Sequence, residues 1–354
     1  MSAWSFWKAA VAGLALGPLL LAPASLAQES DEAEAEAGAD DAIPEDAWRA
    51  VDPDNLLLIE TEEGTVTIEL NPGFAPNHVE RIRKLAQSGI LNGEHFYRVI
   101  DGFVAQAGVN EEVSALDWPA LEAENDRAYG NEGFIALGNR DLFAPEVGHI
   151  EGFPVARNQL LQQEWLLHCP GAVAMARDTG PDTGSTEFYI VLDAQRYLDR
   201  NLTVFGRVID GMEHVQAFPR GDRSVENGVL QPPEAGETIL DFYIASDLPE
   251  DERPQWQVMQ TNSIAFEDFK VAKRIRNEEF FYRTPPAILD ICSFQVPARR
   301  IDDGADEAEE AAAPADSAMP EEMAAPEGAA AGEDTETETQ AEASEPGPTP
   351  ETAD

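Results

Sequence analysis

Apolar and polar residues alternate with a period of two at several places between residues 55 and 301. Val66, Ile68 and Leu70 alternate with polar residues, and an apolar run from Leu56 to Ile59 precedes them across Glu62-Glu63-Gly64. Because side chains of a strand point to opposite faces in turn, this pattern predicts a β-hairpin. Further strands are predicted at residues 96–108, as a pair kinked at Gly102, and at 171–176, 187–192, 202–210 and 238–245.

Two segments carry helical spacing instead. From Pro76 to Ser88 the apolar residues recur every three or four positions, Pro76 suits a first turn, and Gly89 suits a helix end. A second helix is predicted over residues 211–218. Many short strands, two helices and no regular alternation of strand and helix predict a mostly β barrel or sandwich.

The N-terminus has the pattern of an export signal. Lys8 precedes an apolar run from Ala9 to Leu21, and small residues lead up to Ala27. We therefore expect a signal peptide over residues 1–27 and an exported, periplasmic protein. The alternative is a membrane anchor, but the run is shorter than the roughly 20 residues that span a bilayer.

Two segments are dominated by acidic and small residues. Residues 28–54 form an acidic linker, and residues 302–354 contain no lysine or arginine at all. Such segments bury too little apolar surface to offset the entropy of ordering them, so we expect disorder. They carry much of the formal net charge of −45, which disfavours nucleic acid and, after signal cleavage, a membrane as partners. Capture of basic clients is the alternative to plain solvation.

The stretch FYRVIDGFVAQAG, residues 96–108, places Arg98 and Gln106 in strands that packing alone would fill with apolar side chains. AMARDTGPDTGSTEFYIVL and then YLDRNLTVFGRVIDGMEHV follow it along the chain. These three blocks, in this order, resemble the cyclophilin family of peptidyl-prolyl cis-trans isomerases. The resemblance covers residues 55–246.

The resemblance implies a closed, eight-stranded antiparallel barrel with a helix at each end. It also implies a groove on the outer face that binds proline-containing segments of client proteins and accelerates rotation about X-Pro bonds. By motif, Arg98 matches the catalytic arginine, Phe103 the groove phenylalanine and Gln106 the substrate-binding glutamine. The remaining residues expected to bind substrate are Met175, Ala176, Arg177, Glu187, Tyr189, Tyr197, Leu198 and Leu202.

The chain departs from the family pattern at several of these positions. Tyr97 and Leu202 stand where histidines are common, Glu187 where a glutamine is usual, and Tyr197 in place of a tryptophan. A second hypothesis is therefore a catalytically weak module that binds proline-containing partners as a scaffold or chaperone. The presence of Arg98 favours catalysis.

No other chemistry competes with this interpretation. The five histidines show neither H-x-x-x-H nor CxxC spacing, which disfavours a metal site. Ser185 lacks the strand-to-helix context of a G-x-S-x-G nucleophile. We expect no cofactor, no metal and a monomer.

Two further segments are expected to fold beside the barrel. Residues 130–154 are rich in glycine and aromatics, which suits either an ordered Ω-like flap or an inert insertion. Residues 247–301 are expected to be an extension packed on the barrel, with a helix near 263–278. Its Cys292 is expected to form a disulfide with Cys169 in an oxidising compartment; the alternative is two small buried hydrophobic residues.

Overall fold

A computed structural model of the chain describes residues 43–109, 118–130, 133–231, 235–276 and 278–301. The expected signal peptide, the tail 302–354 and residues 28–42 of the acidic linker lie outside these ranges. Within them, no helix has both the length and the apolar content that crossing a membrane requires.

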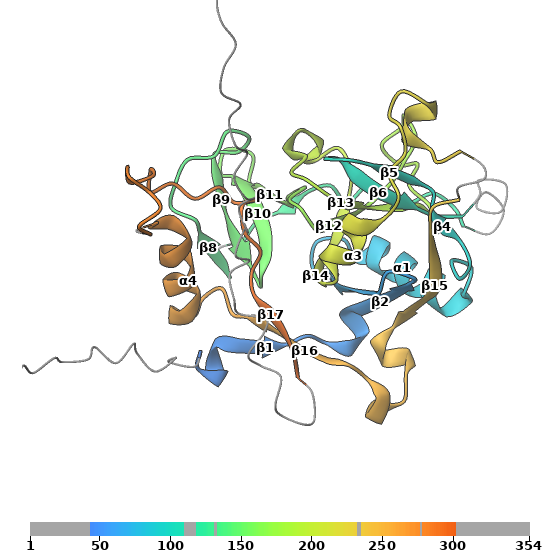
Figure 1. The fold of residues 1–354 in the computed structure, drawn as a ribbon, viewed down its shortest axis with the longest axis horizontal. Helices are drawn as coiled ribbons and strands as arrows, with labels where there is room; N and C mark the ends of the chain where they lie inside the picture. Colours follow the sequence, from blue (N-terminus) through green and yellow to red (C-terminus); the bar gives the residue numbers. More distant parts are fainter. Residues whose placement is uncertain (1–42, 110–117, 131–132, 232–234, 277, 302–354) are drawn as a thin grey trace, which may run out of the picture. The chain divides into compact units, whose positions relative to one another are not determined.

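A nine-stranded antiparallel sheet forms the body of the fold (Figure 1). Its strand order is β4-β15-β2-β3-β14-β12-β13-β6-β5. The two outermost strands, β4 and β5, are separated in the chain by Tyr97 alone, so the sheet curls into a nearly closed barrel. The strands are β2 (Leu56–Thr61), β3 (Thr65–Leu70), β4 (His95–Phe96), β5 (Arg98–Ile100), β6 (Val104–Ala107), β12 (Ala172–Met175), β13 (Phe188–Val191), β14 (Val204–Asp210) and β15 (Glu237–Ile244).

The expectation of eight strands and full closure is therefore not met in detail. The predicted strand at the start of FYRVIDGFVAQAG is divided at Tyr97 into β4, which pairs with β15, and β5, which pairs with β6. At Tyr97, between β4 and β5, the backbone carbonyl pairs with neither β15 nor β6. It accepts a hydrogen bond from the amide of Leu230 instead. The two halves of one chain segment thus form the two ends of the sheet.

Two helices help to fill the barrel interior. Helix α1 (Pro76–Ser88) contributes Val79, Ile82 and Leu85 to the interior hydrophobic cluster, and α3 (Met212–Ala217) contributes Val215. Helix α1 ends at Gly89, which has a left-handed φ of 64° that glycine adopts without strain. Its first turn lacks a cap of its own, and the Glu124 carboxylate accepts from the backbone amides of residues 77 and 78 instead. The remaining helices of the described chain are α4 (Ile264–Arg274) and the 3-10 turns η1 (Glu45–Ala47), η2 (Pro53–Asn55), η3 (Arg196–Leu198), η4 (Glu226–Gly228), η5 (Ala245–Asp247) and η6 (Glu250–Glu252).

The long insertion is a second sheet and not the loop-like flap that its glycines indicated. Its five antiparallel strands have the order β7-β11-β10-β9-β8. Both faces of this sheet are buried: Val147, Ala156 and Trp165 pack into one cluster, and Ile150 and Phe153 into another. A strand buried on both sides lacks the polar alternation that reveals strands in a sequence. The strands are β7 (Arg127–Ala128), β8 (Phe134–Ala136), β9 (Glu146–Ile150), β10 (Phe153–Asn158) and β11 (Gln163–Leu166).

A third sheet joins the two ends of the described chain. Strand β16 (Gln255–Met259) pairs with β1 (Trp48–Ala50) on one side and with β17 (Ala298–Ile301) on the other. The segment 28–54 was expected to be a linker throughout, but residues 45–50 form a helical turn and a strand. Sequence periodicity misses a three-residue strand whose partner in the described chain, β16, lies about 210 positions further along.

The extension packs against the outer face of the barrel. Leu56 and Leu58 of β2 share a hydrophobic cluster with Trp256 and Phe294 of the extension, together with residues of the inserted sheet. Cys169 and Cys292 form a disulfide at this contact, across a sequence separation of 123 residues. The structure thus confirms the predicted pairing and ties the extension to the segment just before β12.

Two buried carboxylates each pair with two arginines. Glu69 of β3 accepts hydrogen bonds from Arg207 of β14 and Arg49 of β1, which joins the third sheet to the barrel. Glu164 of β11 accepts from Arg127 of β7 and Arg157 of β10, all within the inserted sheet. Each carboxylate is at most 5% exposed, so removal of either one leaves a buried arginine, Arg207 or Arg157, without its carboxylate.

We expect replacement of Cys292 by serine to lower the free energy of unfolding by about 2–4 kcal/mol, because the crosslink restricts the unfolded chain. Denaturant unfolding of the oxidised proteins measures the difference. Reduction of the wild type should produce the same loss, whereas an unchanged midpoint would show that the crosslink does not hold the extension.

His149 of β9 is a second buried group with a measurable consequence. Its ring is fully buried against Phe266 and Phe294, and neither ring nitrogen has a hydrogen-bond partner in the described chain. Burial, together with the smaller effect of the charges of Lys270 and Arg207, lowers the pKa of His149 from 6.5 to about 3. The folded protein therefore holds this imidazole neutral.

Since the unfolded chain binds this proton more readily, stability is lost as the pH falls below about 6.5, and the loss continues towards pH 3. Between pH 7 and pH 5 the wild type should lose about 2 kcal/mol of its free energy of unfolding through this group. The variant His149→Phe should lose correspondingly less over the same interval. Denaturant unfolding curves of both proteins at pH 7 and pH 5 test this, and equal losses in the two proteins would contradict it.

Candidate active site

A β-hairpin on the barrel positions the two polar residues of FYRVIDGFVAQAG. Strands β5 and β6 are joined through Gly102, whose φ of 62° suits a tight turn, and Arg98 lies directly opposite Gln106 in the register. Their neighbours Val99 and Ala105 belong to the interior cluster. Alternation along the strands therefore directs Arg98 and Gln106 to the outer face.

The guanidinium of Arg98 is held at two of its nitrogens. Nε donates to the carbonyl oxygen of Asn227 at 2.8 Å, and Nη1 donates to Oε1 of Gln106 at 2.9 Å. The guanidinium carbon lies 5.7 Å from the ring centre of Phe103. Nη2 has no partner in the described part of the chain. Partial burial lowers the pKa of Arg98, but an arginine remains charged at any physiological pH.

Glu187 and Tyr97 complete the hydrogen bonding of Gln106. Nε2 of Gln106 donates to Oε2 of Glu187 at 2.6 Å and to the hydroxyl of Tyr97 at 2.8 Å. The Tyr97 hydroxyl in turn donates to the same carboxylate oxygen at 2.6 Å. Burial, followed by the bond to Glu187, raises the pKa of Tyr97, so the phenol stays protonated.

A hydrophobic cluster continues from this hairpin over the outer face of the barrel. Val104 and Tyr189 are buried in it, and Phe103, Ala176 and Leu202 pack against it partly exposed. The Tyr189 hydroxyl is not directed at solvent: it hydrogen-bonds at 2.9 Å to a ring nitrogen of His168. Burial raises the pKa of this phenol as well. Phe103, Ala176, Tyr189 and Leu202, all expected site residues, thus share one surface.

Other expected substrate-binding residues lie elsewhere. Met175 is 2% exposed and belongs to the interior cluster, because it has the opposite parity to Ala174 and Ala176 along β12. The prediction that Met175 binds substrate on the outer face is therefore wrong. Val104, which was not among the predicted substrate-binding residues, does lie in the outer-face cluster. Tyr197 is 59% exposed on η3, next to a half-buried Leu198.

Arg177 fastens the loop after β12. Its Nε and Nη2 both donate to the carbonyl oxygen of Asn201, and Nη1 donates to that of Asp178. All three bonds go to the backbone, so the side chain holds the segment around Leu202 close to the end of β12. Asn227 and His168 were not singled out from the sequence, since a backbone carbonyl and a distant buried imidazole leave no motif.

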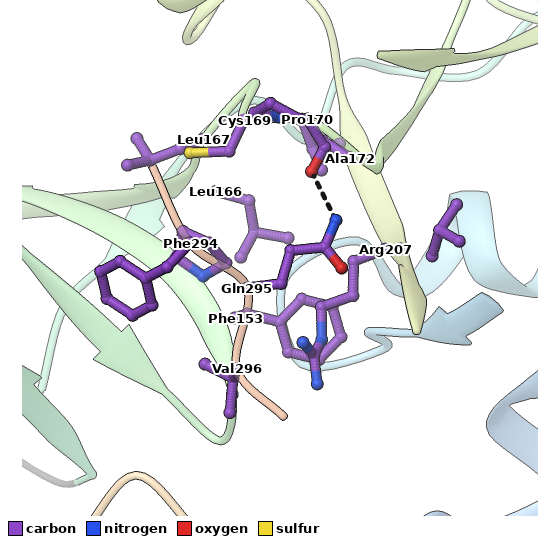
Figure 2. Close-up of a pocket in the computed structure, with 15 residues that line it drawn as sticks. Phe153, Leu166, Leu167, Cys169, Pro170, Ala172, Arg207, Phe294, Gln295 and Val296 are labelled. Carbon is purple, nitrogen blue, oxygen red and sulfur yellow. Dashed lines mark hydrogen bonds between the residues drawn. The ribbon is translucent and has the colours of Figure 1, made fainter. Parts of the chain in front are cut away.

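Two hollows in the described chain lie away from Arg98. One, of about 20 Å³, is enclosed between barrel, inserted sheet and extension beside Cys169, Arg207 and Gln295 (Figure 2). That volume holds about one water molecule, so this hollow is a packing defect at a junction and not a substrate site. The other, of about 290 Å³, lies along α1 beside Arg81 and Trp118. No group of three or more His, Cys, Asp or Glu side chains in the described ranges could hold a metal ion.

Comparisons with known proteins agree on the class. A family model described as cyclophilin type peptidyl-prolyl cis-trans isomerase/CLD matches residues 56–240. A probable peptidyl-prolyl cis-trans isomerase of Brucella suis is 32% identical over 190 residues, which cover 52% of this chain and 81% of the relative. Peptidyl-prolyl cis-trans isomerase B of Bacillus subtilis is 31% identical over 162 residues, 46% of this chain and 88% of the relative.

A solved structure is similar over a larger part. The crystal structure of a cyclophilin from Hirschia baltica matches with a TM-score of 0.59 and 30% identity, over 72% of this chain and 93% of that one. Because this share exceeds the 52% covered by the Brucella suis relative, the likeness extends beyond the barrel. Fold and matches together define an isomerase of peptide bonds that precede proline. The chain belongs to the cyclophilin-type peptidyl-prolyl cis-trans isomerase family.

We expect Arg98→Ala to reduce kcat/KM by about 10- to 150-fold, the equivalent of one charge-assisted hydrogen bond of about 1.5–3 kcal/mol. The melting temperature should change little, since the side chain lies on the outer face. A protease-coupled assay on an Ala-Pro peptide, with a thermal melt of each protein, measures both. Phe103→Ala should lower both together; a parallel loss for Arg98→Ala would instead make that residue structural.

Proposed function

We propose that this isomerase acts on X-Pro bonds in unfolded or extended segments of exported proteins, with Arg98, Phe103 and Gln106 as its reacting surface. The observation that carries the proposal is the state of the Arg98 guanidinium. It is fixed at Nε and Nη1 by neutral acceptors and has Nη2 left for a substrate. In the described chain Arg98 forms no ion pair, so its charge is not neutralised by direct contact with a carboxylate.

The chemistry follows from the amide bond. Rotation about it faces a barrier of about 18–20 kcal/mol, because the nitrogen lone pair is shared with the carbonyl. In the twisted transition state the lone pair is localised on the prolyl nitrogen. A guanidinium donor beside this nitrogen binds the twisted state more strongly than the planar one, which lowers the barrier.

One such bond is not sufficient alone. A thousandfold acceleration needs about 4 kcal/mol, more than the roughly 1.5–3 kcal/mol of a single charge-assisted bond. The remainder is assigned to the apolar surface of Phe103, Tyr189 and Leu202, which would hold the prolyl ring and exclude water. Gln106, next to Arg98, would hold the substrate backbone on one side of the bond.

The cellular compartment of the protein is inferred from the sequence and from the disulfide. The N-terminal pattern of an export signal and the pairing of Cys169 with Cys292 both suit an oxidising compartment such as the periplasm. We propose a monomer that meets clients in solution there, without nucleic acid, cofactor or membrane. Fractionation of expressing cells, followed by N-terminal sequencing, tests this: mature protein starting at Gln28 is expected, and a cytoplasmic full-length chain would contradict it.

The scaffold hypothesis makes a different prediction for the same clients. A weak, scaffolding module would bind a proline-containing peptide and leave its exchange rate unchanged. Two-dimensional NMR exchange spectra of such a peptide, with wild type and Arg98→Ala, distinguish the two. We expect faster exchange with the wild type alone; binding without faster exchange in both proteins would favour the scaffold.

We also expect deletion of residues 302–354 to leave kcat/KM on a neutral tetrapeptide unchanged, because an acidic tail adds no group to the proposed reaction. The comparison should be repeated with a lysine-rich peptide at low salt. A loss confined to the basic peptide would indicate client capture by the tail, and a loss on both peptides would give the tail a structural role.

A further inference from the structure

The amide of Gln106 must point one way for Arg98 to be held as it is. Its Oε1 accepts from Nη1 of Arg98, so its NH2 group has to face away from the guanidinium. An amide rotated by half a turn has almost the same shape, but it would place two donors against a cation. Some group on the far side of Gln106 has to select between the two orientations.

Glu187 has the chemistry to make that selection. An ionised carboxylate only accepts, so Oε2 of Glu187 requires the NH2 side of Gln106 at 2.6 Å. The Tyr97 hydroxyl donates to the same oxygen, and its own oxygen is then free to accept the second N–H of Gln106. Every hydrogen bond in this network is donated in the same direction, from Arg98 through Gln106 to Glu187. A neutral amide at position 187 could face Gln106 with either end.

The backbone makes room for this contact. A side chain on Gly108 would place its Cβ 2.4 Å from Cγ and 2.7 Å from Cα of Glu187. The residue after β6 and the residue before β13 therefore approach so closely that only glycine fits at position 108. The Glu187 side chain occupies the space that a larger residue would need.

The charge of Glu187 also acts on the guanidinium. Arg223 lies with its guanidinium 5.5 Å from the ring centre of Phe103, on which Arg98 also rests. Two cations thus share one aromatic ring, and Glu187 is the nearby carboxylate that offsets their repulsion. Since Arg98 has no direct ion pair in the described chain, this compensation acts across the intervening Gln106 side chain and not by contact.

We propose that Glu187, together with Tyr97, is a positioning residue for the isomerase reaction. The pair fixes the Gln106 amide with its oxygen towards Arg98 and thereby sets the direction in which Nη2 of Arg98 meets the substrate. Glu187 does not touch the reacting bond. This inference rests on the proposed role of Arg98.

The central test is a double-mutant cycle of Glu187→Leu and Gln106→Ala, assayed with an Ala-Pro peptide. Glu187→Leu should lower kcat by about tenfold, with KM changed less than twofold and the melting temperature preserved. In the Gln106→Ala background the same change should cost less than twofold, because there is no amide left to orient. Losses that multiply in the double variant, or full activity of Glu187→Leu, would overturn the proposal.

The isosteric variant Glu187→Gln distinguishes positioning from plain packing. Glutamine keeps the shape of glutamate, but its neutral amide can face Gln106 with either end. We expect a kcat two- to fivefold below that of the wild type, with KM and the melting temperature unchanged. A kcat equal to that of the wild type would contradict the role of the carboxylate charge.

Asp101→Asn serves as the matched control, because Asp101 lies on the same hairpin with its side chain 89% exposed. It should reproduce the wild-type kcat, KM and melting temperature. Arg98→Ala separates the two proposals: if Arg98→Ala shows its expected loss of kcat/KM and Glu187→Leu is fully active, the positioning role alone fails. If Arg98→Ala keeps the wild-type kcat/KM, the proposed role of the arginine fails as well.

Discussion

The two-residue alternation along the barrel strands is the constraint on which the rest of this structure depends. It sends Val99, Ala105 and Phe188 into the interior and Arg98, Gln106 and Tyr189 to the outside. A slip of one residue in any strand pair would exchange the two sets, so burial of the interior also fixes the surface chemistry. No separate element is needed to position the reacting surface, since the strands that carry it on their outer face also form the hydrophobic core with their inner face.

The buried arginine clusters and Arg98 have different kinds of partner. Arg49 and Arg207 converge on the buried Glu69, which joins the third sheet to the barrel, and Arg127 and Arg157 converge on the buried Glu164 within the inserted sheet. Arg98 is held by a backbone carbonyl and a side-chain amide. A guanidinium bound only by neutral acceptors keeps its positive charge available to a substrate, whereas a carboxylate in direct contact largely neutralises that charge.

The elements that sequence reasoning found are those in which local pattern and burial agree. The helix predicted from Pro76 to Ser88 has those bounds, and the strand predicted over 187–192 is observed over Phe188–Val191. Arg98 and Gln106 were found because an exposed polar pair in an apolar hairpin conflicts with packing. The inserted sheet was missed because it is covered on both faces, so its sequence lacks polar alternation. Strand β1 was missed because it has three residues and a partner about 210 positions away.

Periodicity and ordered motifs in the sequence were sufficient for a mostly β fold, for the family resemblance and for the position of the catalytic arginine. The cysteine pair was expected from the even count and an oxidising compartment, not from a local pattern. The inward face of Met175, the bond between the Tyr189 hydroxyl and His168, and the convergence of Glu187 and Tyr97 on Gln106 follow from the tertiary structure alone. Tyr97 and Gln106 are 9 positions apart, and the other contacts join residues 21 to 90 positions apart in the chain. They follow from strand register and close backbone approach, which packing of the whole chain sets and no local pattern encodes.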